Sequence, residues 1–213
     1  SQADSNLAYI ENYGNRAKTD RAFAKASHVS RISFYNNRLV SNYLDTRSAI
    51  GEWNQVENRY VLTSGSQGVH GVRARLAEKV FGIPKKRLRV ITPDVGGGFG
   101  PKAITYREYA LVLEAGKRLS RPVKWTADRT EHFLVDAHGR DNVVEAAMAM
   151  DADGRFMGVK INIIANMGAY LSENGGFIPK LGATMATGVY DITAVDIEIK
   201  GVYTNTAPVD AYR

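Results

Sequence analysis

The sequence predicts an α+β fold in which mixed and antiparallel sheets pack against helices. Two patterns within the 213 residues lead to this class. Before residue 136, short apolar strands alternate with stretches of helical periodicity, whereas after it strands joined by turns dominate. The hydrophobic content of 44% is ordinary for a folded protein and allows a sizeable core. We therefore expect two substructures, residues 1–135 and 136–213.

The expected elements follow from apolar spacing and from turn residues. Helices are expected over residues 17–26, 66–82, 102–119, 128–135 and 178–186. Strands are expected over residues 29–35, 60–63, 88–92, 122–125, 143–150, 156–164 and 195–202. Between residues 39 and 59, short apolar pieces are mixed with asparagine and aspartate, and the pattern does not separate strand from loop.

The helix after residue 66 has the clearest signals in the first half. Its apolar side chains recur at helical spacing at Val69, Val72, Leu76 and Val80. Ser66 is the expected N-cap, and Gly82 followed by Pro84 ends the helix. Gln67 then lies at the N-terminus of the helix, where its side-chain amide can reach a ligand. An ordinary solvent-facing glutamine at a helix start fits the sequence equally well.

The second half contains the clearest hairpin. Val143–Met150 and Phe156–Ile164 flank the turn residues Asp151–Arg155, and polar residues alternate with apolar ones along the second strand. One face of this hairpin is therefore expected to be exposed to solvent. The final strand alternates in the same way and should point Ile197 and Ile199 inward.

Composition excludes several kinds of chemistry. The chain has no cysteine, which removes disulfides, thiolate metal sites and iron–sulfur ligation, so that redox chemistry would need a bound cofactor. No apolar run approaches the length of a membrane helix, the first residues are polar rather than signal-like, and we expect a cytoplasmic protein. Neither end has the signals of a natural terminus, which indicates a piece of a longer polypeptide.

The net charge of +6 and the isoelectric point near 9.5 come largely from one region. The basic residues of this region are Arg73, Arg75, Lys79, Lys85, Lys86, Arg87 and Arg89. We interpret them as a solvated face of a helix and strand, with docking of an anionic ligand or an acidic partner as the second interpretation. A basic nucleic-acid-binding module is the alternative function, although the basic residues do not form a stripe with regularly interleaved aromatic residues.

A glycine-rich loop is the strongest local signal. Within Pro93–Lys102, Gly96, Gly97, Gly98 and Gly100 surround a phenylalanine. Glycine offers no side chain to pack, so such a run indicates that something approaches the backbone closely, and bare N–H groups suit an anionic ligand. A Walker loop needs Ser or Thr after its lysine, and a dinucleotide fingerprint needs glycine where Pro101 stands. Both common phosphate motifs are therefore excluded.

Other catalytic patterns are weak. The histidines His28, His70, His132 and His138 have no metal-ligand spacing, and core or surface roles are expected for them. No nucleophile-elbow motif occurs. Four carboxylates lie close together in sequence, at Asp128, Glu131, Asp136 and Asp141. We interpret this group as a capped, solvated helix start with Asp128 as the N-cap, rather than as an acid–base pair.

Three separated segments resemble the molybdopterin-binding large subunit of the xanthine dehydrogenase and aldehyde oxidase family. They are Thr63–Gly68, Pro93–Lys102 and Ala211–Arg213, and Val202–Thr206 and Asn166–Tyr170 also fit in order and spacing. Within this family the carbon monoxide dehydrogenase large subunit and its relatives are the most similar branch. The resemblance covers nearly the whole chain and implies the first cofactor-binding lobe of such an enzyme.

This resemblance implies roles for particular residues. Gln67 would hydrogen-bond an oxo group on molybdenum, and Gly97, Gly98, Phe99 and Gly100 would form a wall of backbone amides and one aromatic ring. In addition, Arg213 would lie at the edge of the active-site loop. The implied cofactor is molybdopterin with molybdenum, in its cytosine dinucleotide form. Implied partners are the rest of the large subunit and the iron–sulfur and FAD subunits or domains.

Departures from the family pattern limit what can be carried over. Xanthine-oxidising members have a glutamate shortly after the glycine loop, where this chain has Ala103, which argues against a purine substrate. Some relatives have Met-Glu-Pro-Arg where Leu44–Arg47 stands. The family's catalytic glutamate lies beyond these residues, so the resemblance implies that the 213 residues alone are catalytically inert. The expected reaction of the whole enzyme is oxidation of an aldehyde, carbon monoxide or a heterocycle with water-derived oxygen.

Overall fold

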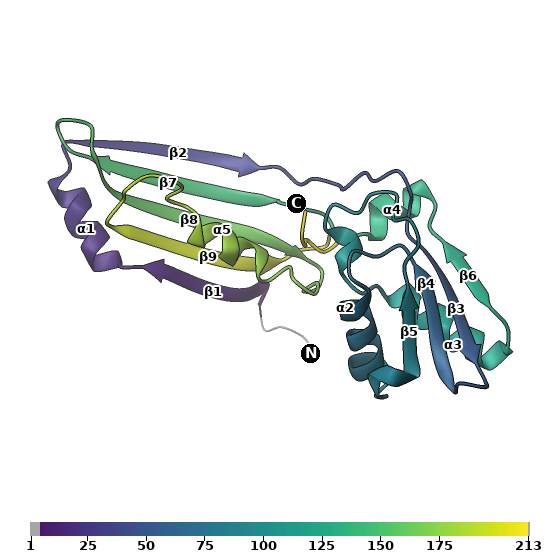
Figure 1. Cartoon of the computed structure of the whole chain (residues 1–213). Helices are drawn as coiled ribbons and strands as arrows, with labels where there is room; N and C mark the ends of the chain where they lie inside the picture. The colour runs from purple at the N-terminus through teal and green to yellow at the C-terminus, as the bar shows by residue number, and fades with distance from the viewer. Residues whose placement is uncertain (1–4, 213) are drawn as a thin grey trace. The chain divides into compact units, whose positions relative to one another are not determined.

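The computed structural model describes residues 5–212, which form two compact units (Figure 1). The first, here called the sheet unit, contains the described residues up to Leu39 together with His138–Asp210. The second, here called the loop unit, contains Val40–Ala137 followed by Ala211 and Tyr212. The sequence pattern placed one division, between residues 135 and 136. The two units instead divide after Leu39 and again after Ala137, because the first strands pair with strands of the second half.

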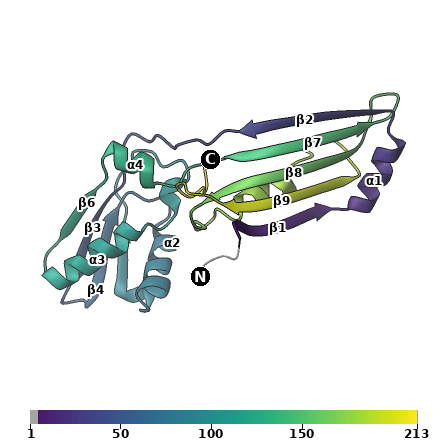
Figure 2. The ribbon, with the colours of Figure 1, turned by 180° about the vertical axis from the view of Figure 1, so that it is seen from behind.

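The sheet unit is built on one five-stranded sheet with the strand order β1-β9-β8-β7-β2. Its strands are β1 (Leu7–Gly14), β2 (His28–Asn36), β7 (Asn142–Met150), β8 (Phe156–Gly168) and β9 (Val195–Tyr203). Neighbouring strands run antiparallel except β8 and β9, which are parallel and are connected through α5 (Ile178–Thr184). Viewed from behind, β2 and β1 form the two edges, with α1 (Arg16–Lys25) between them in sequence (Figure 2).

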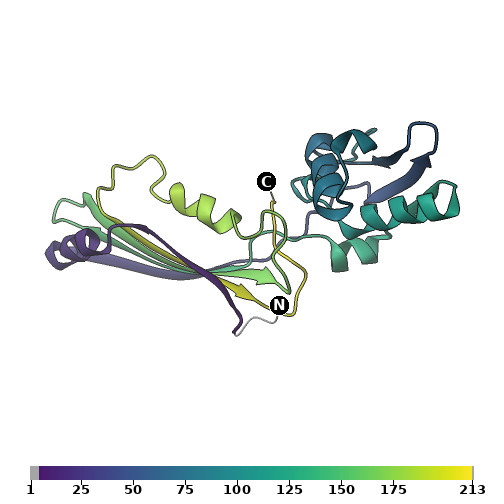
Figure 3. The same cartoon turned by 90° about the horizontal axis from the view of Figure 1, so that it is seen from below.

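The core of the sheet unit is apolar and lies beneath α5. Alternate residues of β9 point inward, where Ile197 and Ile199 are at most 1% exposed. They pack with Ala165 and Met167 of β8 and with Ala183 of α5. Figure 3 shows α5 lying over one face of the five-stranded sheet. The alternation predicted for the last strand is thus confirmed, because a strand with one covered face buries every second residue.

The loop unit contains a four-stranded sheet with the order β5-β4-β3-β6. Its strands are β3 (Ser48–Asn54), β4 (Arg59–Ser64), β5 (Leu88–Ile91) and β6 (Val123–Thr126). Strands β4 and β5 are parallel, whereas β3 is antiparallel to both β4 and β6. The helices are α2 (Val69–Ala74), a π-helix that continues it (Arg75–Val80), α3 (Arg107–Leu119) and α4 (Arg129–Val135). Short 3₁₀ turns occupy Lys85–Arg87 and Pro101–Ala103.

Helices α2 and α3 pack on the sheet of the loop unit and share one hydrophobic core. This core contains Leu62 of β4, Val72 of α2 and Leu113 of α3, each fully buried. Helix α3 approaches β3 closely, because a Cβ at Gly51 would lie 2.3 Å from the backbone of Val112. The sheet and its helices therefore form a rigid support from which the connecting loops project.

The sequence predicted most elements but misplaced some boundaries. The N-cap of α2 is Gly68 rather than Ser66, whose hydroxyl instead accepts a hydrogen bond from the Gly68 N–H at 3.0 Å. The single helix expected over residues 102–119 is wrong in its first turn, because a 3₁₀ turn ends at Ala103 and α3 begins only at Arg107. Strand β1 was not predicted, since its pairing partner lies almost 190 residues away. The confirmed α+β class rests on the mixed sheets.

Candidate functional site

The glycine-rich loop joins β5 to the 3₁₀ turn that begins at Pro101. Gly96, Gly97 and Gly100 have positive φ angles of 63°, 90° and 110°. Gly100 needs glycine for a second reason, because a Cβ there would lie 2.4 Å from the carbonyl oxygen of Ala211. The loop leads into a three-residue 3₁₀ turn rather than a long helix, so a helix dipole contributes little to anion binding here. The conformation of the loop backbone is therefore the feature that supports a role in ligand binding.

Gln67 reaches the glycine loop through its side chain. The Gly100 N–H donates a hydrogen bond of 2.9 Å to Gln67 Oε1, and the Gln67 N–H donates to the Lys102 carbonyl at 3.0 Å. A backbone N–H can only donate, so this contact fixes the oxygen of the amide toward the loop and leaves the Nε2 group as a free donor. Within residues 5–212, that NH₂ group has no hydrogen-bond partner.

Gly98 makes room for this arrangement. A Cβ at Gly98 would lie 2.5 Å from Gln67 Oε1, closer than real Cβ contacts come. Any larger residue would therefore push the amide aside. Gln67 is itself exposed, so the donor lies at an accessible surface. The sequence named Gln67, Gly98 and Gly100 together, and the structure brings these three into direct contact.

Phe99 and Gly97 complete the loop. Phe99 has a φ of 51°, an uncommon left-handed conformation for a residue with a side chain, and it remains 44% exposed. Its ring edge lies 3.4 Å from the position that a Cβ of Gly97 would take. An aromatic ring held open to solvent beside bare amides can form one side of a binding surface. Arg213, the sixth expected site residue, lies outside the described residues.

A buried polar cluster around Asp136 lies in the same unit and was not foreseen. The Asp136 carboxylate accepts hydrogen bonds from Tyr43 Oη, from Arg47 Nε at 2.7 Å and from His132 Nδ1 at 2.8 Å. All four side chains are at most 1% exposed. Because a carboxylate only accepts, the proton of His132 lies on Nδ1. Burial, followed by the charge of Asp136, raises the pKa of Tyr43 far above its usual value.

The carboxylates near α4 therefore divide into two kinds. Asp128 is the N-cap of α4, as predicted, and accepts a hydrogen bond from the Glu131 N–H at 2.7 Å. The interpretation of Asp136 as part of a solvated helix start is wrong, because it ends α4 on the buried side. His132 has a core role, which agrees with the expectation for the histidines. The i,i+4 spacing of His132 and Asp136 was the signal that could have revealed the cluster.

The basic residues lie on a partly solvated surface of the loop unit. Arg73, Lys85, Lys86 and Arg89 line a hollow of about 370 Å³. Lys85 is half-exposed and pairs with Glu78 at 3.1 Å. Such exposed pairs contribute little to stability. The first interpretation, a solvated face of helix and strand, describes this surface adequately.

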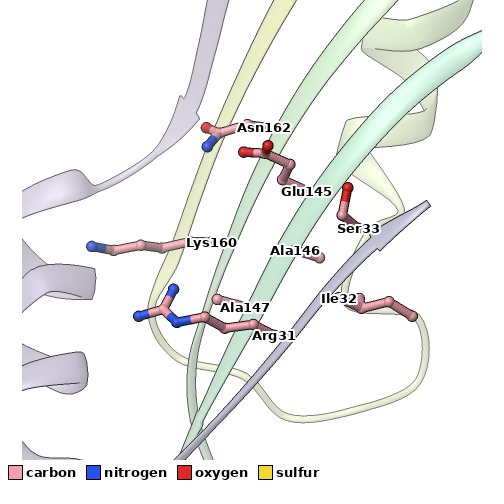
Figure 4. Close-up of a pocket in the computed structure, with 8 residues that line it drawn as sticks. All are labelled: Arg31, Ile32, Ser33, Glu145, Ala146, Ala147, Lys160 and Asn162. Carbon is pink, nitrogen blue, oxygen red and sulfur yellow. The ribbon is translucent and has the colours of Figure 1, made fainter. Parts of the chain in front are cut away.

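A second hollow of about 310 Å³ lies on the sheet unit (Figure 4). Its walls come from β2, β7 and β8, and they place Arg31 and Lys160 near Glu145 and Asn162. Lys160 is already engaged, because its ammonium pairs with Asp20 at 2.5 Å. Mixed charges on an open sheet face do not define a particular ligand. Within residues 5–212, no helix is both long and apolar enough to cross a membrane.

The exposed amide of Gln67 and the glycine loop form a candidate ligand-binding surface, and comparison with known proteins gives the family. The chain belongs to the molybdopterin cofactor-binding domain family, whose model matches residues 1–213. It is 35% identical over 197 residues to the nicotine 6-hydroxylase large subunit of Paenarthrobacter nicotinovorans, covering 91% of this chain and 24% of that one. It is 33% identical over 196 residues to the carbon monoxide dehydrogenase large chain of Hydrogenophaga pseudoflava, covering 92% of this chain and 24% of the relative.

The structural comparison agrees with the sequence comparison. Reconstituted CO dehydrogenase from Oligotropha carboxidovorans superposes with a TM-score of 0.88 at 29% identity, covering 97% of this chain and 26% of that one. The predicted family and fold are therefore confirmed. The chain spans about a quarter of the length of the curated relatives it matches. None of these three relatives supports the nucleic-acid-binding alternative.

Proposed function

We propose that this chain forms one wall of the cofactor site in a molybdenum hydroxylase. The enzyme would oxidise an aldehyde, carbon monoxide or a heterocycle with water-derived oxygen. The observation that carries the proposal is the amide of Gln67, whose oxygen is held by the Gly100 N–H so that its NH₂ group is free to donate. A neutral donor of this kind stabilises an oxygen ligand without having to titrate.

The residues of the loop fit such a cofactor chemically. Gly97 and Gly98 carry no side chains that would block their backbone N–H groups, and Gly98 leaves the space that the Gln67 amide requires. The Gly100 N–H is already used to hold that amide. Hydrogen-bond donors without positive charge suit a group with several oxygen atoms. The ring of Phe99 offers an apolar surface beside these donors. Arg213 remains our proposed residue at the edge of the site.

The chemistry is divided between the cofactor and the chain. When bound, the molybdenum–pterin group supplies the redox centre that accepts electrons from the substrate. Gln67 binds and orients an oxygen atom of that group through Nε2. The loop of Gly97–Gly100 holds the group against a preformed backbone, which lowers the entropic cost of ordering the site. Phe99 would exclude water from one side of it.

Further details of the cofactor and partners follow from the family and are part of the proposal. We infer the cytosine dinucleotide form of molybdopterin, and iron–sulfur and FAD subunits or domains that carry the electrons away. The relatives named large subunit and large chain belong, by those names, to proteins with other subunits. Because the chain has no cysteine, iron–sulfur clusters cannot be ligated by thiolates within it. A cytoplasmic location is also proposed.

Analysis of the intact enzyme tests this function. The complex that contains this chain is purified, and its molybdenum, iron, flavin and pterin are measured per mole of protein. Acid hydrolysis of the extracted cofactor identifies the attached nucleotide. We expect about one molybdenum and one pterin per large subunit, with cytosine as the base. A complex that oxidises substrate and contains neither molybdenum nor pterin would overturn the proposal.

A further inference from the structure

We propose that Lys102 is a positioning residue, which holds the glycine loop in the shape that Gln67 requires through hydrogen bonds to two backbone carbonyls. Its consequence for cofactor binding rests on the function proposed above. The residue itself does not face the wall formed by Gln67 and Phe99, because its side chain is 1% exposed while both of these are exposed.

The Lys102 ammonium lies where its charge must be satisfied by specific partners. Nζ donates to the carbonyl oxygen of Asp45 and to that of Val95, each at 2.6 Å. The carboxylate of Asp45 is more distant, at 3.8 Å, and is 57% exposed. Nζ also lies 4.5 Å from the centre of the Tyr43 ring. A buried cation without such partners would be strongly destabilising, so the two carbonyls and the ring account for its burial.

These two carbonyls belong to separate segments. Val95 directly precedes the glycines and Lys102 follows them, so the bond to Val95 closes the loop across its base. The bond to Asp45 ties the closed loop to the segment that contains Tyr43. The Asp45 N–H reinforces this tie by donating to the Gly96 carbonyl at 3.2 Å. The two segments are packed tightly at this point, since a Cβ at Gly96 would lie 2.2 Å from Asp45 Cβ.

The segment that receives the loop is itself held rigidly. Arg129 donates to the carbonyls of Tyr43 and Leu44 at 2.7 and 2.6 Å. The Tyr43 hydroxyl and Arg47 are bound by Asp136. Three successive carbonyls, from Tyr43 to Asp45, thus accept hydrogen bonds from cationic side chains. A loop fastened to such a support keeps one conformation.

Lys102 also reaches Gln67 directly through its own backbone. Its carbonyl accepts the Gln67 N–H at 3.0 Å, while its side chain fixes the start of the loop. One residue therefore sets the position of the Gln67 backbone and of the glycines that its amide must contact. Burial lowers the pKa of the ammonium below its usual value, with the charge of Asp45 opposing this effect. The geometry, not the titration, carries the assignment.

Hydrogen exchange of the intact enzyme, purified without molybdenum, tests the assignment independently of the cofactor. Lys102→Met removes the hydrogen-bond donor and keeps an unbranched side chain of similar length. We expect the amide of Gly100, which is protected by Gln67, to exchange at least about tenfold faster in this variant. Peptides from β8 should exchange as in the unchanged protein. Unaltered exchange at Gly100 would overturn the proposal.

Asp45→Asn is the matched control. It removes the carboxylate but leaves the Asp45 carbonyl, so exchange at Gly100 should change by less than about twofold if the carbonyls are the relevant partners. An effect as large as that of Lys102→Met would show that the ion pair acts instead. Lys102→Arg restores a buried cation with several donors, and we expect it to recover part of the protection. Global unfolding of both Lys102 variants would contradict a positioning role and indicate support of the whole unit.

A second measurement on the loaded enzyme separates the two proposals. With molybdate supplied, we expect Lys102→Met to retain less pterin and molybdenum than Asp45→Asn, with a changed electron paramagnetic resonance signal for the metal that remains. If the enzyme without any substitution contains no pterin or molybdenum, the proposed function is refuted. The hydrogen-exchange difference between Lys102→Met and that enzyme would still support the positioning role of Lys102. Full cofactor content with an unchanged signal in Lys102→Met refutes the positioning role alone.

Discussion

The sheet unit and the loop unit bury different kinds of side chain. In the sheet unit, the core beneath α5 consists of apolar residues such as Met167, Ile197 and Ile199. The loop unit has an apolar core as well, but it also buries four acidic or basic side chains at 1% exposure or less, namely Arg47, Lys102, His132 and Asp136. Among the described acidic and basic side chains of the sheet unit, Asp210 alone is buried to that degree.

This difference follows from what each unit has to hold. Regular strands satisfy their own backbone groups, so an apolar core is enough for the sheet unit. The loop unit must fix two irregular segments, residues 43–47 and 93–102, whose carbonyls have no strand partners. The buried Lys102 and the partly buried Arg129 satisfy four of these carbonyls, although burying a cation carries a desolvation cost. Buried charge in this protein therefore accompanies the positioned loop, and substitutions in the two units should behave differently.

Breaking the Asp136 cluster should have the largest effect. Asp136→Asn removes the carboxylate 2.7 Å from the buried Nε of Arg47 and leaves that guanidinium only the Glu108 carboxylate at 3.1 Å. We expect the loop unit to lose about 3–5 kcal/mol of unfolding free energy. Native-state hydrogen exchange measures this at the amides of β3 and β4. Asp196→Asn is the control, because its partner Arg16 is 62% exposed, and it should cost less than about 0.5 kcal/mol. A loss below about 1 kcal/mol for Asp136→Asn would contradict the comparison.

An apolar truncation should affect the other unit. Ile199→Ala removes a fully buried side chain beneath α5 and should cost about 3 kcal/mol, read from amide exchange in β8 and β9. Ile10→Ala, at a site that is 47% exposed in β1, should cost less than about 1 kcal/mol. Equal costs for the two substitutions would mean that this core does not support the sheet.

A smaller effect is expected from pH in the sheet unit. Burial, and then the charge of Glu11, raises the pKa of Tyr9 from its ordinary value near 10 to about 12. Between these values the unfolded chain ionises its phenol while the folded protein keeps the neutral form. The contribution of Tyr9 is thus fully present below pH 10 and is lost as the pH rises toward 12. The unfolding free energy of Tyr9→Phe should therefore fall less steeply with pH in this range than that of the protein with Tyr9. Urea unfolding of both proteins at several pH values measures this, and an identical pH dependence would contradict the prediction.

The sequence revealed local structure better than long-range pairing. Periodicity identified α3, the hairpin of β7 and β8, and the inward side chains of β9, because each depends on neighbouring residues. It did not identify β1, and it could not show that β2 pairs with β7, since strand pairing across more than 100 residues leaves no local pattern. The break between the 3₁₀ turn and α3 was also missed. Glycine and proline there suggested a helix start, and tertiary contacts decided otherwise.

For the site, the motifs named candidate residues but gave no sign of the side chains that support them. The order of the three motifs pointed to Gln67 and to the loop, and the contact of Gln67 with Gly100 agrees with this. Nothing local indicated that Lys102 would be buried, because lysine is rarely found inside a protein. Asp136 looked like part of a solvated helix start, and its i,i+4 spacing from His132 was the one local signal of the cluster. Each residue also has partners in a segment about 60 to 90 residues earlier in the chain, namely Asp45 for Lys102 and both Tyr43 and Arg47 for Asp136.

We propose above that the Gln67 amide binds the cofactor from the position it occupies against Gly98. Gly98→Ala tests it most directly, because the new Cβ would lie 2.5 Å from the end of a flexible side chain and displace the amide at little cost in stability. Gly182→Ala is the control, since nothing lies within 4 Å of a Cβ there. Pterin and molybdenum are measured in both intact enzymes alongside the unfolding midpoint. We predict that Gly98→Ala loses most of its cofactor while its midpoint matches that of the control. Full cofactor content in Gly98→Ala would contradict the claim.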